Sequence, residues 1–371
     1  MTPRIRVLML VDLLEPRSGG GERFAVGLAA HLPRDRFEVA LCATRAVEPP
    51  WDRTLRESGV PHFALGRRAT ADVVPLARLA RTLRRQRVDV LHAHMFGSNV
   101  WGTIVGRAAR VPVVVAHEQT WDYQGRPLRR LLDGRLIGRH ADAFVAVSTA
   151  DRDRMVAIER VPAGKVHVEL NAYVPRTGPR QPARLREELG LDGSAPLVGT
   201  AAILRPQKGL EVLLAAFARL RDRQAHLVIA GDGERRAALE RRADELEIAG
   251  RTHFLGLRDD VDGILADVDV AAMSSDFEGT PLFAFECMAA RTPLVATAVG
   301  GLPDMLEHGR SAILVPPRDA AALADGIDAL LADPARRATL ATAAAERLPR
   351  HRIDAVAERF GALYRDLLAR R

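Results

Sequence analysis

The 371-residue sequence predicts an α/β protein with two domains, each built on a mostly parallel sheet. Apolar runs of strand length alternate with longer amphipathic patterns along the chain, which is typical of strand–helix–strand units. The alternation stops once, at the proline-rich stretch PRTGPRQP that begins at Pro175, and then starts again. We therefore expect a first domain at 1–175, a linker at 176–186, a second domain at 187–350 and a last helix at 351–371.

The composition argues against several other classes of protein. The net charge is +7, yet Lys165 and Lys208 are the only lysines, so the positive charge reflects a composition rich in arginine. Aromatic residues make up 5% of the chain, too few to interleave with arginines on a nucleic-acid surface, and no nucleic-acid partner is expected. Cys42 and Cys287 lack disulfide or metal-ligand spacing. Without a membrane-length apolar run or a signal-like start, we expect a cytoplasmic protein.

The first domain is expected to contain at least five strands. They lie at Ile5–Val11, Phe37–Cys42, Val88–His92, Val111–His117 and Ala143–Val147. The triplet Gly19-Gly20-Gly21 stands between the first strand and the next helix. Glycine lets backbone N–H groups approach a ligand closely, so this loop is a candidate for contact with a phosphate or a sugar, although a surface turn would read the same. The dinucleotide fingerprint G-x-G-x-x-G is absent.

Three histidines fall at two of these strand ends. We expect one of His92 and His94 to pack inward and the other to line a cleft, and His117 ends the strand in VVVAHEQ. Metal binding by the three stays open, without carboxylate partners to support it, and no metal site is predicted.

The second domain repeats the strand–loop–helix pattern. Its strands are expected at Leu197–Ile203, His226–Ala230, 254–257, Val268–Met273 and Pro293–Thr297. Arg205 and Lys208 follow the first of them, just before a helix with leucines on one face. Gly231 and Gly233 follow the second strand, and Leu257 closes the third. Loops at the carboxyl ends of parallel strands meet at one edge of the sheet, where ligands of open α/β sheets bind.

The stretch that organises the second domain starts at Ser274 and reads SSDFEGTPLFAFECMAARTPLVATAVGG. Thr280 and Pro281 predict an N-cap followed by a first-turn proline. Glu278 is then expected in the loop after the Val268–Met273 strand, and Glu286 on the second turn of the helix. Two acids near a helix N-terminus also complement the helix dipole, but here they share an edge with two cations and several glycines.

These motifs closely resemble the family-4 retaining glycosyltransferases of the GT-B fold: Glu278 and Glu286 have the E-x7-E spacing, and the Gly19–Glu22 loop, Arg205 and Lys208 match other family positions. The resemblance implies two Rossmann-like domains facing across a deep cleft, with the last helix packing back on the first domain. Arg291 departs from it, because many relatives have glycine there.

The resemblance also implies roles for individual residues. Glu286 would hold the ribose hydroxyls of a nucleotide, Glu278 would meet the transferred sugar, Arg205 and Lys208 would grip the diphosphate, and His117 would reach the donor sugar and the reacting centre. We therefore expect His117, Glu278, Arg205 and Lys208 to be catalytic. The expected donor-binding residues are Gly19, Gly20, Arg205, Lys208, Gly231, Gly233, Leu257, Glu278, Gly279, Thr280, Pro281, Leu282 and Glu286.

The leading hypothesis is a retaining, metal-independent glycosyltransferase without a cofactor, which moves a sugar from a nucleotide diphosphate sugar, with UDP as the default, to a hydroxyl acceptor. A nucleotide-sugar epimerase of the same fold and a non-catalytic nucleotide-binding protein are the alternatives. Acceptor contacts are expected from first-domain loops such as 121–126. The basic helices expected at Val74–Arg87 and Leu128–Arg139 leave open a peripheral contact with the inner face of the membrane.

Overall fold

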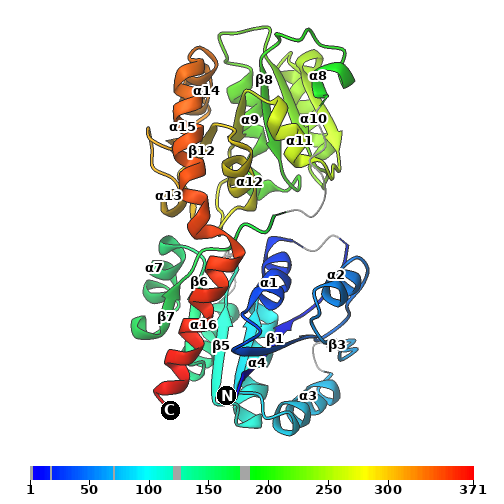
Figure 1. Ribbon diagram of the computed structural model, residues 1–371. Helices are drawn as coiled ribbons and strands as arrows, with labels where there is room; N and C mark the ends of the chain where they lie inside the picture. Colours follow the sequence, from blue (N-terminus) through cyan, green and yellow to red (C-terminus); the bar gives the residue numbers. More distant parts are fainter. Residues whose placement is uncertain (1–2, 17–18, 70–71, 120–126, 176–183) are drawn as a thin grey trace. The chain divides into compact units, whose positions relative to one another are not determined.

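A computed structural model describes residues 3–16, 19–69, 72–119, 127–175 and 184–371. The chain forms two compact units (Figure 1): unit 1 comprises residues 1–174 and 351–371, and unit 2 comprises residues 175–350. Most of the expected linker, residues 176–183, lies outside the described part, and a short helix already begins at Leu185, inside the range expected to be linker.

Unit 1 is a seven-stranded parallel sheet with the strand order β3-β2-β1-β4-β5-β6-β7. Its strands are β1 Ile5–Val11, β2 Phe37–Ala43, β3 His62–Ala64, β4 Val90–His94, β5 Val113–His117, β6 Ala143–Ala146 and β7 Val166–Val168. Its helices include α1 Gly20–His31, α2 Trp51–Glu57, α3 Val74–Arg85, α4 Phe96–Ala109, α5 Pro127–Leu131, the π-helix η1 Leu132–Ile137, α6 Gly138–His140, α7 Thr149–Ala157 and α16 Ile353–Ala369.

The two faces of this sheet are covered by different helices. Because side chains alternate along a strand, Val7 and Met9 of β1 point to one face and Leu8 and Leu10 to the other. The first face packs against α1 and α16, which contribute residues such as Phe24 and Phe360 to one buried core. The second face packs against α3 and α4. The last helix of the chain thus belongs to unit 1, and the prediction of two parallel-sheet α/β domains is confirmed.

Unit 2 is a six-stranded parallel sheet with the order β10-β9-β8-β11-β12-β13. Its strands are β8 Leu197–Ala201, β9 His226–Ala230, β10 Thr252–Gly256, β11 Val270–Met273, β12 Leu294–Thr297 and β13 Ile313–Val315. Its helices include α8 Leu185–Glu188, the 3₁₀ turn η3 Pro206–Lys208, α9 Leu210–Phe217, α10 Arg236–Glu245, α11 Val261–Asp267, α12 Leu282–Ala290, α13 Leu302–Met305, α14 Ala320–Leu331 and α15 Pro334–Arg347. Helices α9, α10 and α14 share one apolar core with the sheet.

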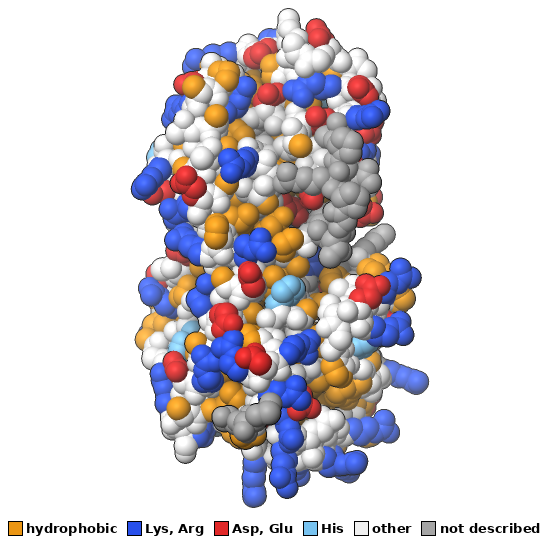
Figure 2. Space-filling view, in the orientation of Figure 1, with side chains coloured by type: hydrophobic (Ala, Val, Ile, Leu, Met, Phe, Trp, Pro, Cys, Tyr) orange, Lys and Arg blue, Asp and Glu red, His pale blue; other side chains and the backbone are white. Residues whose placement is uncertain are grey.

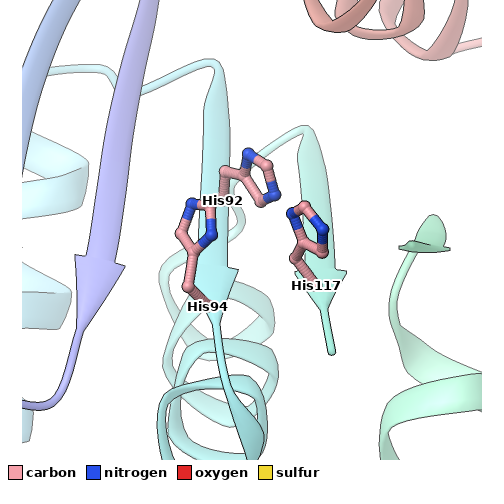
Figure 3. A group of neighbouring side chains, drawn as sticks. All are labelled: His92, His94 and His117. Carbon is pink, nitrogen blue, oxygen red and sulfur yellow. The ribbon is translucent and has the colours of Figure 1, made fainter. Parts of the chain in front are cut away.

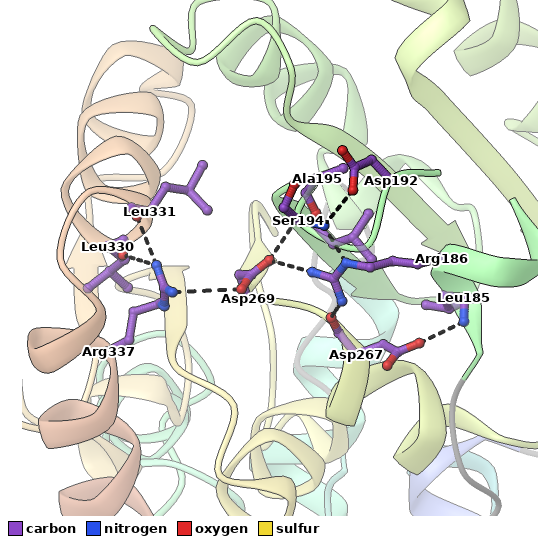
Figure 4. A network of polar contacts seen from close by, with 11 residues as sticks. Leu185, Arg186, Asp192, Ser194, Ala195, Asp267, Asp269, Leu330, Leu331 and Arg337 are labelled. Atoms are coloured by element: carbon purple, nitrogen blue, oxygen red, sulfur yellow. Dashed lines mark hydrogen bonds and ion pairs between the residues drawn. The ribbon is translucent and has the colours of Figure 1, made fainter. Parts of the chain in front are cut away.

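A polar network fixes the start of unit 2 to the start of β11 (Figure 4). Arg186 in α8 donates to the carboxylate of Asp269 over 2.9 Å and to the carbonyl of Asp267 over 2.7 Å. Arg337 in α15 lies 3.7 Å from the same Asp269 carboxylate, which also accepts the backbone N–H of Leu197. One carboxylate therefore ties the first helix, the first strand and a late helix of the unit together.

The strands that the sequence did not predict are the short ones at or near the sheet edges. β3, β7 and β13 have three residues each, too few for a periodic apolar pattern to stand out. The expected strand at Val88–His92 begins and ends two residues later, as β4. Among the described residues, no helix has the length and apolar character needed to cross a bilayer.

Candidate active site

The candidate site lies at the carboxyl edge of the unit 2 sheet, where β8 and β11 are neighbours. The chain runs outward from β8 through β9 to β10 on one side, and from β11 through β12 to β13 on the other. The strand order therefore reverses between β8 and β11, and ligands of open α/β sheets bind at such a switch point. The loop after β8 carries Arg205 and Lys208, and the loop after β11 carries Glu278.

Lys208 and Glu278 form an ion pair at this edge. The Lys208 Nζ lies 2.6 Å from Oε1 of Glu278. The hydroxyl of Ser275 donates to the same oxygen over 2.6 Å. The Glu278 side chain is 6% exposed and that of Lys208 is 24% exposed, so the pair sits at the border between interior and solvent. Within the described part of the chain, no hydrogen bond reaches the other carboxylate oxygen, Oε2, which leaves that atom for a ligand.

Backbone contacts hold the two loops together. Asp276 donates its N–H to the carbonyl of Gln207 over 2.9 Å, and the side-chain amide of Gln207 donates to the carbonyl of Phe277 over 3.0 Å. Gly209 has φ +56°, and a Cβ there would lie 2.3 Å from the carbonyl oxygen of Ser274. Only glycine accepts both the left-handed conformation and this close approach. The position of Lys208 opposite Glu278 is thus set by main-chain packing.

The loop after β12 fixes Glu278 from the other side. Gly300 has φ +55°, and a Cβ there would lie 2.0 Å from the carbonyl oxygen of Glu278. Gly301 donates its N–H to the carbonyl of Gly279 over 2.7 Å. Glu278 and Gly279 are therefore clamped between the ends of β8 and β12.

Glu286 lies on the second turn of α12, as the sequence predicts, and its side chain is half-buried. The helix itself begins differently from the prediction. Its first residue is Leu282 and its N-cap is Pro281, which has no side-chain capping bond, so the predicted cap at Thr280 with a first-turn proline is wrong. A proline has no hydroxyl to cap with, and the extended backbone of Pro281 (ψ 121°) delays the helix by one residue. Arg291 ends α12 with φ +58°, the left-handed conformation that makes glycine common at this kind of position.

The remaining expected donor contacts surround this edge. Gly231 and Gly233 lie against the backbone of the β8 loop, where added Cβ atoms would come within 1.9 Å of the Ala202 oxygen and 2.6 Å of the Leu204 oxygen. Leu257, after β10, is 70% exposed, and Ile203, after β8, is 39% exposed. These two side chains provide apolar surface beside the edge.

Positive charge faces solvent beside the ion pair. Arg205 is exposed, and its guanidinium makes no hydrogen bond or ion pair among the described residues. It precedes η3, whose end leads through Gly209 into the N-terminus of α9. Asp276 is held by Arg318, which donates to it over 2.9 and 3.1 Å. The edge therefore offers one uncommitted cation and one cation paired with Glu278.

Gly19, Gly20 and His117 belong to unit 1. Gly19 is the N-cap of α1 and Gly20 its first residue. His117 ends β5, and its backbone N–H and C=O are both bonded to the side chain of Asn99. His92 and His94 are both fully buried beside it (Figure 3), so the expectation that one of the two lines a cleft is wrong. Residues i and i+2 of a strand share a face, and α1 and α16 cover that face. The loop 121–126, expected to contact the acceptor, lies outside the described residues.

Sequence reasoning did not single out Ser275. Its hydroxyl is buried and shares Oε1 of Glu278 with Lys208. The available signal was a serine three residues before a glutamate, which is the spacing of a capping box, although here the hydroxyl bonds the carboxylate itself.

Comparisons with known proteins agree with this geometry. Residues 18–173 match the family model "Glycosyltransferase Family 4" and residues 182–347 match "Glycosyl transferases group 1". An alpha-D-kanosaminyltransferase of Streptomyces kanamyceticus is 28% identical over 82% of this chain and 85% of its own. A D-inositol 3-phosphate glycosyltransferase of Xylanimonas cellulosilytica is 31% identical over 69% of this chain and 66% of its own. The structure of Anabaena HepE in complex with UDP-glucose has a TM-score of 0.83 at 24% identity, covering 98% of this chain and 100% of that one.

Proposed function

Since the chain belongs to the family-4 glycosyltransferases with the GT-B fold, we propose that it transfers a sugar from a nucleotide diphosphate sugar to a hydroxyl acceptor, with retention of the anomeric configuration. The observation that carries the proposal is the Lys208–Glu278 ion pair at the switch point of the unit 2 sheet. When a donor binds, the ammonium group of Lys208 can move away from the Glu278 carboxylate. Lys208 would then contact the phosphates, and Glu278 would contact the sugar.

The donor would bind across the ends of β8, β10 and β11. Arg205 and Lys208 would contact the diphosphate, beside the N-terminus of α9, whose backbone N–H groups favour negative charge. Glu286 on α12 would accept the ribose hydroxyls. Exposed Ile203 and Leu257 would flank the base. The Rossmann-like loops at Gly231 and Gly233 and at Gly279, Thr280, Pro281 and Leu282 would complete the surface.

The proposed chemistry proceeds on one face of the sugar. As the bond to the leaving phosphate breaks, positive charge grows on the sugar ring and negative charge on the phosphate oxygen. Glu278, through Oε2, would stabilise the sugar end, while Arg205 and Lys208 stabilise the phosphate end. The leaving phosphate would accept the proton of the attacking hydroxyl, so that no covalent enzyme intermediate forms. His117 would contact the donor sugar after its imidazole turns out of the buried position that it occupies here.

UDP is our first choice of nucleotide because a protein of the same fold, HepE, has been observed with UDP and with UDP-glucose. We propose no cofactor. A metal at the diphosphate is unnecessary in this scheme because Arg205 and Lys208 would supply the positive charge that a divalent ion would otherwise provide.

The test is to mix the full chain with a panel of nucleotide sugars, with and without hydroxyl acceptors. Transfer to an acceptor supports the proposal. Epimerisation of the donor, or binding of nucleotide without any reaction, would replace it with the corresponding alternative function. Proton NMR of the fresh product decides the stereochemistry, because an inverted anomeric configuration would refute the retaining mechanism.

A peripheral contact with an anionic membrane is the remaining part of the proposal. Val73 and Val74 at the start of α3 are 57% and 59% exposed, and Arg78, Arg81 and Arg85 follow on the same exposed helix. Basic side chains crowd the part of unit 1 where α3 lies (Figure 2). Aliphatic anchors beside arginines favour an anionic interface. Co-sedimentation with phosphatidylglycerol vesicles, but not with phosphatidylcholine vesicles, supports the contact, and an unchanged yield for a double variant, R78Q/R81Q, would remove it.

A further inference from the structure

Unit 1 contains a cluster of three histidines that the proposed reaction does not fully use. His92 and His94 alternate along β4, and His117 of β5 lies opposite His94 in the parallel register. All three rings are fully buried and face one another (Figure 3). One ring nitrogen from each lies within 4.8 Å of the other two. The arrangement is built by the sheet itself and does not depend on flexible side chains at the surface.

The ring nitrogens are poorly satisfied within the protein. Nε2 of His92, Nε2 of His94 and both nitrogens of His117 are buried and have no hydrogen-bond partner among the described residues. The Nδ1 atoms of the first two face partners: that of His92 lies 2.6 Å from the hydroxyl of Tyr364, and that of His94 lies 3.5 Å from the side-chain amide of Gln119. Buried polar atoms without partners are rare, and three imidazoles that leave them in one place point to a ligand.

From this convergence we propose that His92, His94 and His117 form a binding site for a borderline divalent transition-metal ion of the Zn²⁺ class. Zn²⁺ binds histidine nitrogens at about 2.0–2.1 Å, which places the nitrogens about 3.3 Å apart in a tetrahedral site. The nitrogens lie within 4.8 Å of one another, so the largest separation would shrink by at most about 1.5 Å, which rotations of the rings can supply. Three histidines with an open fourth position form a well-known type of zinc site.

The surroundings suit an ion of this class. Burial lowers the pKa of all three histidines, that of His94 to about 3, so each ring is neutral and offers a lone pair at neutral pH. Rings of Phe24 and Phe360 close the cluster, with centroids 5.2 and 5.5 Å from that of His117. A hydrogen bond from Nδ1–H of His92 to Tyr364 would orient that ring for coordination through Nε2, the usual outer-sphere arrangement. Harder ions such as Mg²⁺ prefer oxygen ligands.

The site has a consequence for the reaction, and this part rests on the proposed function. Coordination holds His117 inside the cluster, whereas contact with the donor sugar requires it to turn outward. Metal binding and transfer would then compete for one imidazole. Transfer by the wild-type protein should fall as Zn²⁺ occupies the site, while a His94→Asn variant, which has lost a ligand, should not respond to Zn²⁺.

Binding is tested on the full chain, stripped with a chelator and desalted. It is then equilibrated overnight with Co²⁺ or Zn²⁺, and a second sample is refolded from denaturant in the presence of the ion. We expect one ion per chain by elemental analysis, visible absorption of tetrahedral Co²⁺, and a melting temperature that rises with Zn²⁺ concentration. His92→Asn and His94→Asn should abolish all three signals. Tyr364→Phe, which keeps every ligand, should weaken binding about 10-fold or more.

A second histidine pair provides the control. His226 and His253 in unit 2 have ring nitrogens 3.0 Å apart but no third ligand among the described residues. His226→Asn should therefore leave metal uptake unchanged. The proposal is overturned if neither the equilibrated nor the refolded protein takes up an ion, or if uptake survives in both His92→Asn and His94→Asn. If the protein takes up metal but transfers no sugar from any donor, the metal site stands and the proposed function is wrong. If it transfers sugar but takes up no metal, the proposed function stands and the metal site is wrong.

Discussion

The carboxyl edges of the two sheets differ in chemistry although both sheets are parallel and wrapped by helices. In unit 2 the edge carries full charges at the border with solvent, with Lys208 against Glu278 and Arg205 exposed nearby. In unit 1 the ends of β4 and β5 carry neutral imidazoles that are completely buried. The difference arises from what covers the edge. Helices α1 and α16 close over the histidines, whereas the loops of unit 2 bury Glu278 but leave Arg205 exposed and Lys208 partly exposed.

This difference predicts where charge is handled during the reaction. A phosphate leaving group gains negative charge, so it needs cations that are already oriented and only partly hydrated. Unit 2 provides them and unit 1 does not. Substitutions at the unit 2 edge should therefore act on turnover and nucleotide binding. Substitutions of His92 and His94 in the unit 1 cluster should act mainly on packing and metal uptake, whereas His117 takes part in both the cluster and the proposed reaction.

The largest effect is expected for Lys208→Ala. Removing a cation that stabilises the departing phosphate should lower kcat by about 10²–10³, comparable to the loss of one preorganised transition-state donor. This loss of kcat is measured by steady-state kinetics, with the donor that the nucleotide-sugar panel identifies. The other lysine provides a matched control: Lys165 donates to the carbonyls of Arg139 and Ala141 in unit 1, so Lys165→Ala should change stability and leave kcat near the wild-type value. Equal losses in the two variants would contradict a specific role for Lys208.

The next largest effect separates the two glutamates. Glu286→Ala should weaken binding of the free nucleoside diphosphate by about 1.5–3 kcal/mol, the usual cost of one hydrogen bond to a charged group. Glu278→Ala should mainly lower kcat, because only the sugar end changes charge and shape in the transition state. Calorimetry with nucleoside diphosphate distinguishes the two. If both variants bind it as the wild type does, the assignment of the ribose to Glu286 is wrong.

The sequence predicted the elements around these residues because the patterns there are long and strong. β1 and β9 match the expected ranges residue for residue. Glu286 lies on the second turn of α12, as was predicted from a helix start at Thr280-Pro281, because the actual start at Leu282 is only one residue later. The α/β class and the family were confirmed. The helix start at Leu282 was missed because Thr280-Pro281 has the residues of a cap, but the helix begins after the proline.

Other features of the site depend on contacts that no local pattern contains. Oε1 of Glu278 accepts hydrogen bonds from Ser275, three positions earlier, and from Lys208, 70 positions earlier. The burial of both His92 and His94 follows from α16 covering β4, since Tyr364, 272 positions later, bonds to His92. A sequence shows that histidines alternate along a strand, but which face is covered depends on a distant helix.

A smaller effect is expected for Ser275→Ala. Ser275 positions Glu278 by donating to Oε1, and Lys208 donates to the same atom, so one of two donors remains after the change. The net value of such a bond is about 0.5–1.5 kcal/mol, which corresponds to a loss of kcat of about 2- to 13-fold. Ser275→Thr keeps the hydroxyl and should restore most of the rate. A loss in Ser275→Ala that matches Glu278→Ala would mean that Ser275 contacts the substrate itself.

Unit 1 should also respond to pH through a buried carboxyl group. Burial and the neighbouring Glu118 raise the pKa of Asp133 in η1 to about 8, and they outweigh the attraction of Arg129, 3.6 Å away. A carboxyl whose pKa is raised in the folded state stabilises the fold below its unfolded pKa of about 3.9, and this contribution is lost as the pH rises through about 8. The melting temperature of the wild type should therefore decline between pH 6 and pH 8.5. Asp133→Asn, which cannot ionise, should make that decline shallower, and an unchanged slope would contradict the assignment.

The smallest effect is expected for chelation, and it bears most directly on the contrast between the two sheet edges. Arg205 and Lys208 are proposed to supply the charge that a metal provides in other transferases. Exhaustive treatment of the wild-type protein with EDTA should therefore leave the rate of transfer equal to that of the untreated protein, or higher. A rise would come from unit 1, because removing Zn²⁺ from the histidine cluster frees His117. Adding single ions back to the EDTA-treated protein distinguishes the effects of the two edges. Mn²⁺ or Mg²⁺ should not change the rate of transfer, whereas Zn²⁺ should lower the rate of the wild type but not that of His94→Asn. Activity that collapses in EDTA and returns with Mn²⁺ would show that the diphosphate is held by a metal. The role given to the two cations would then be wrong, because a bound ion would already neutralise the leaving phosphate.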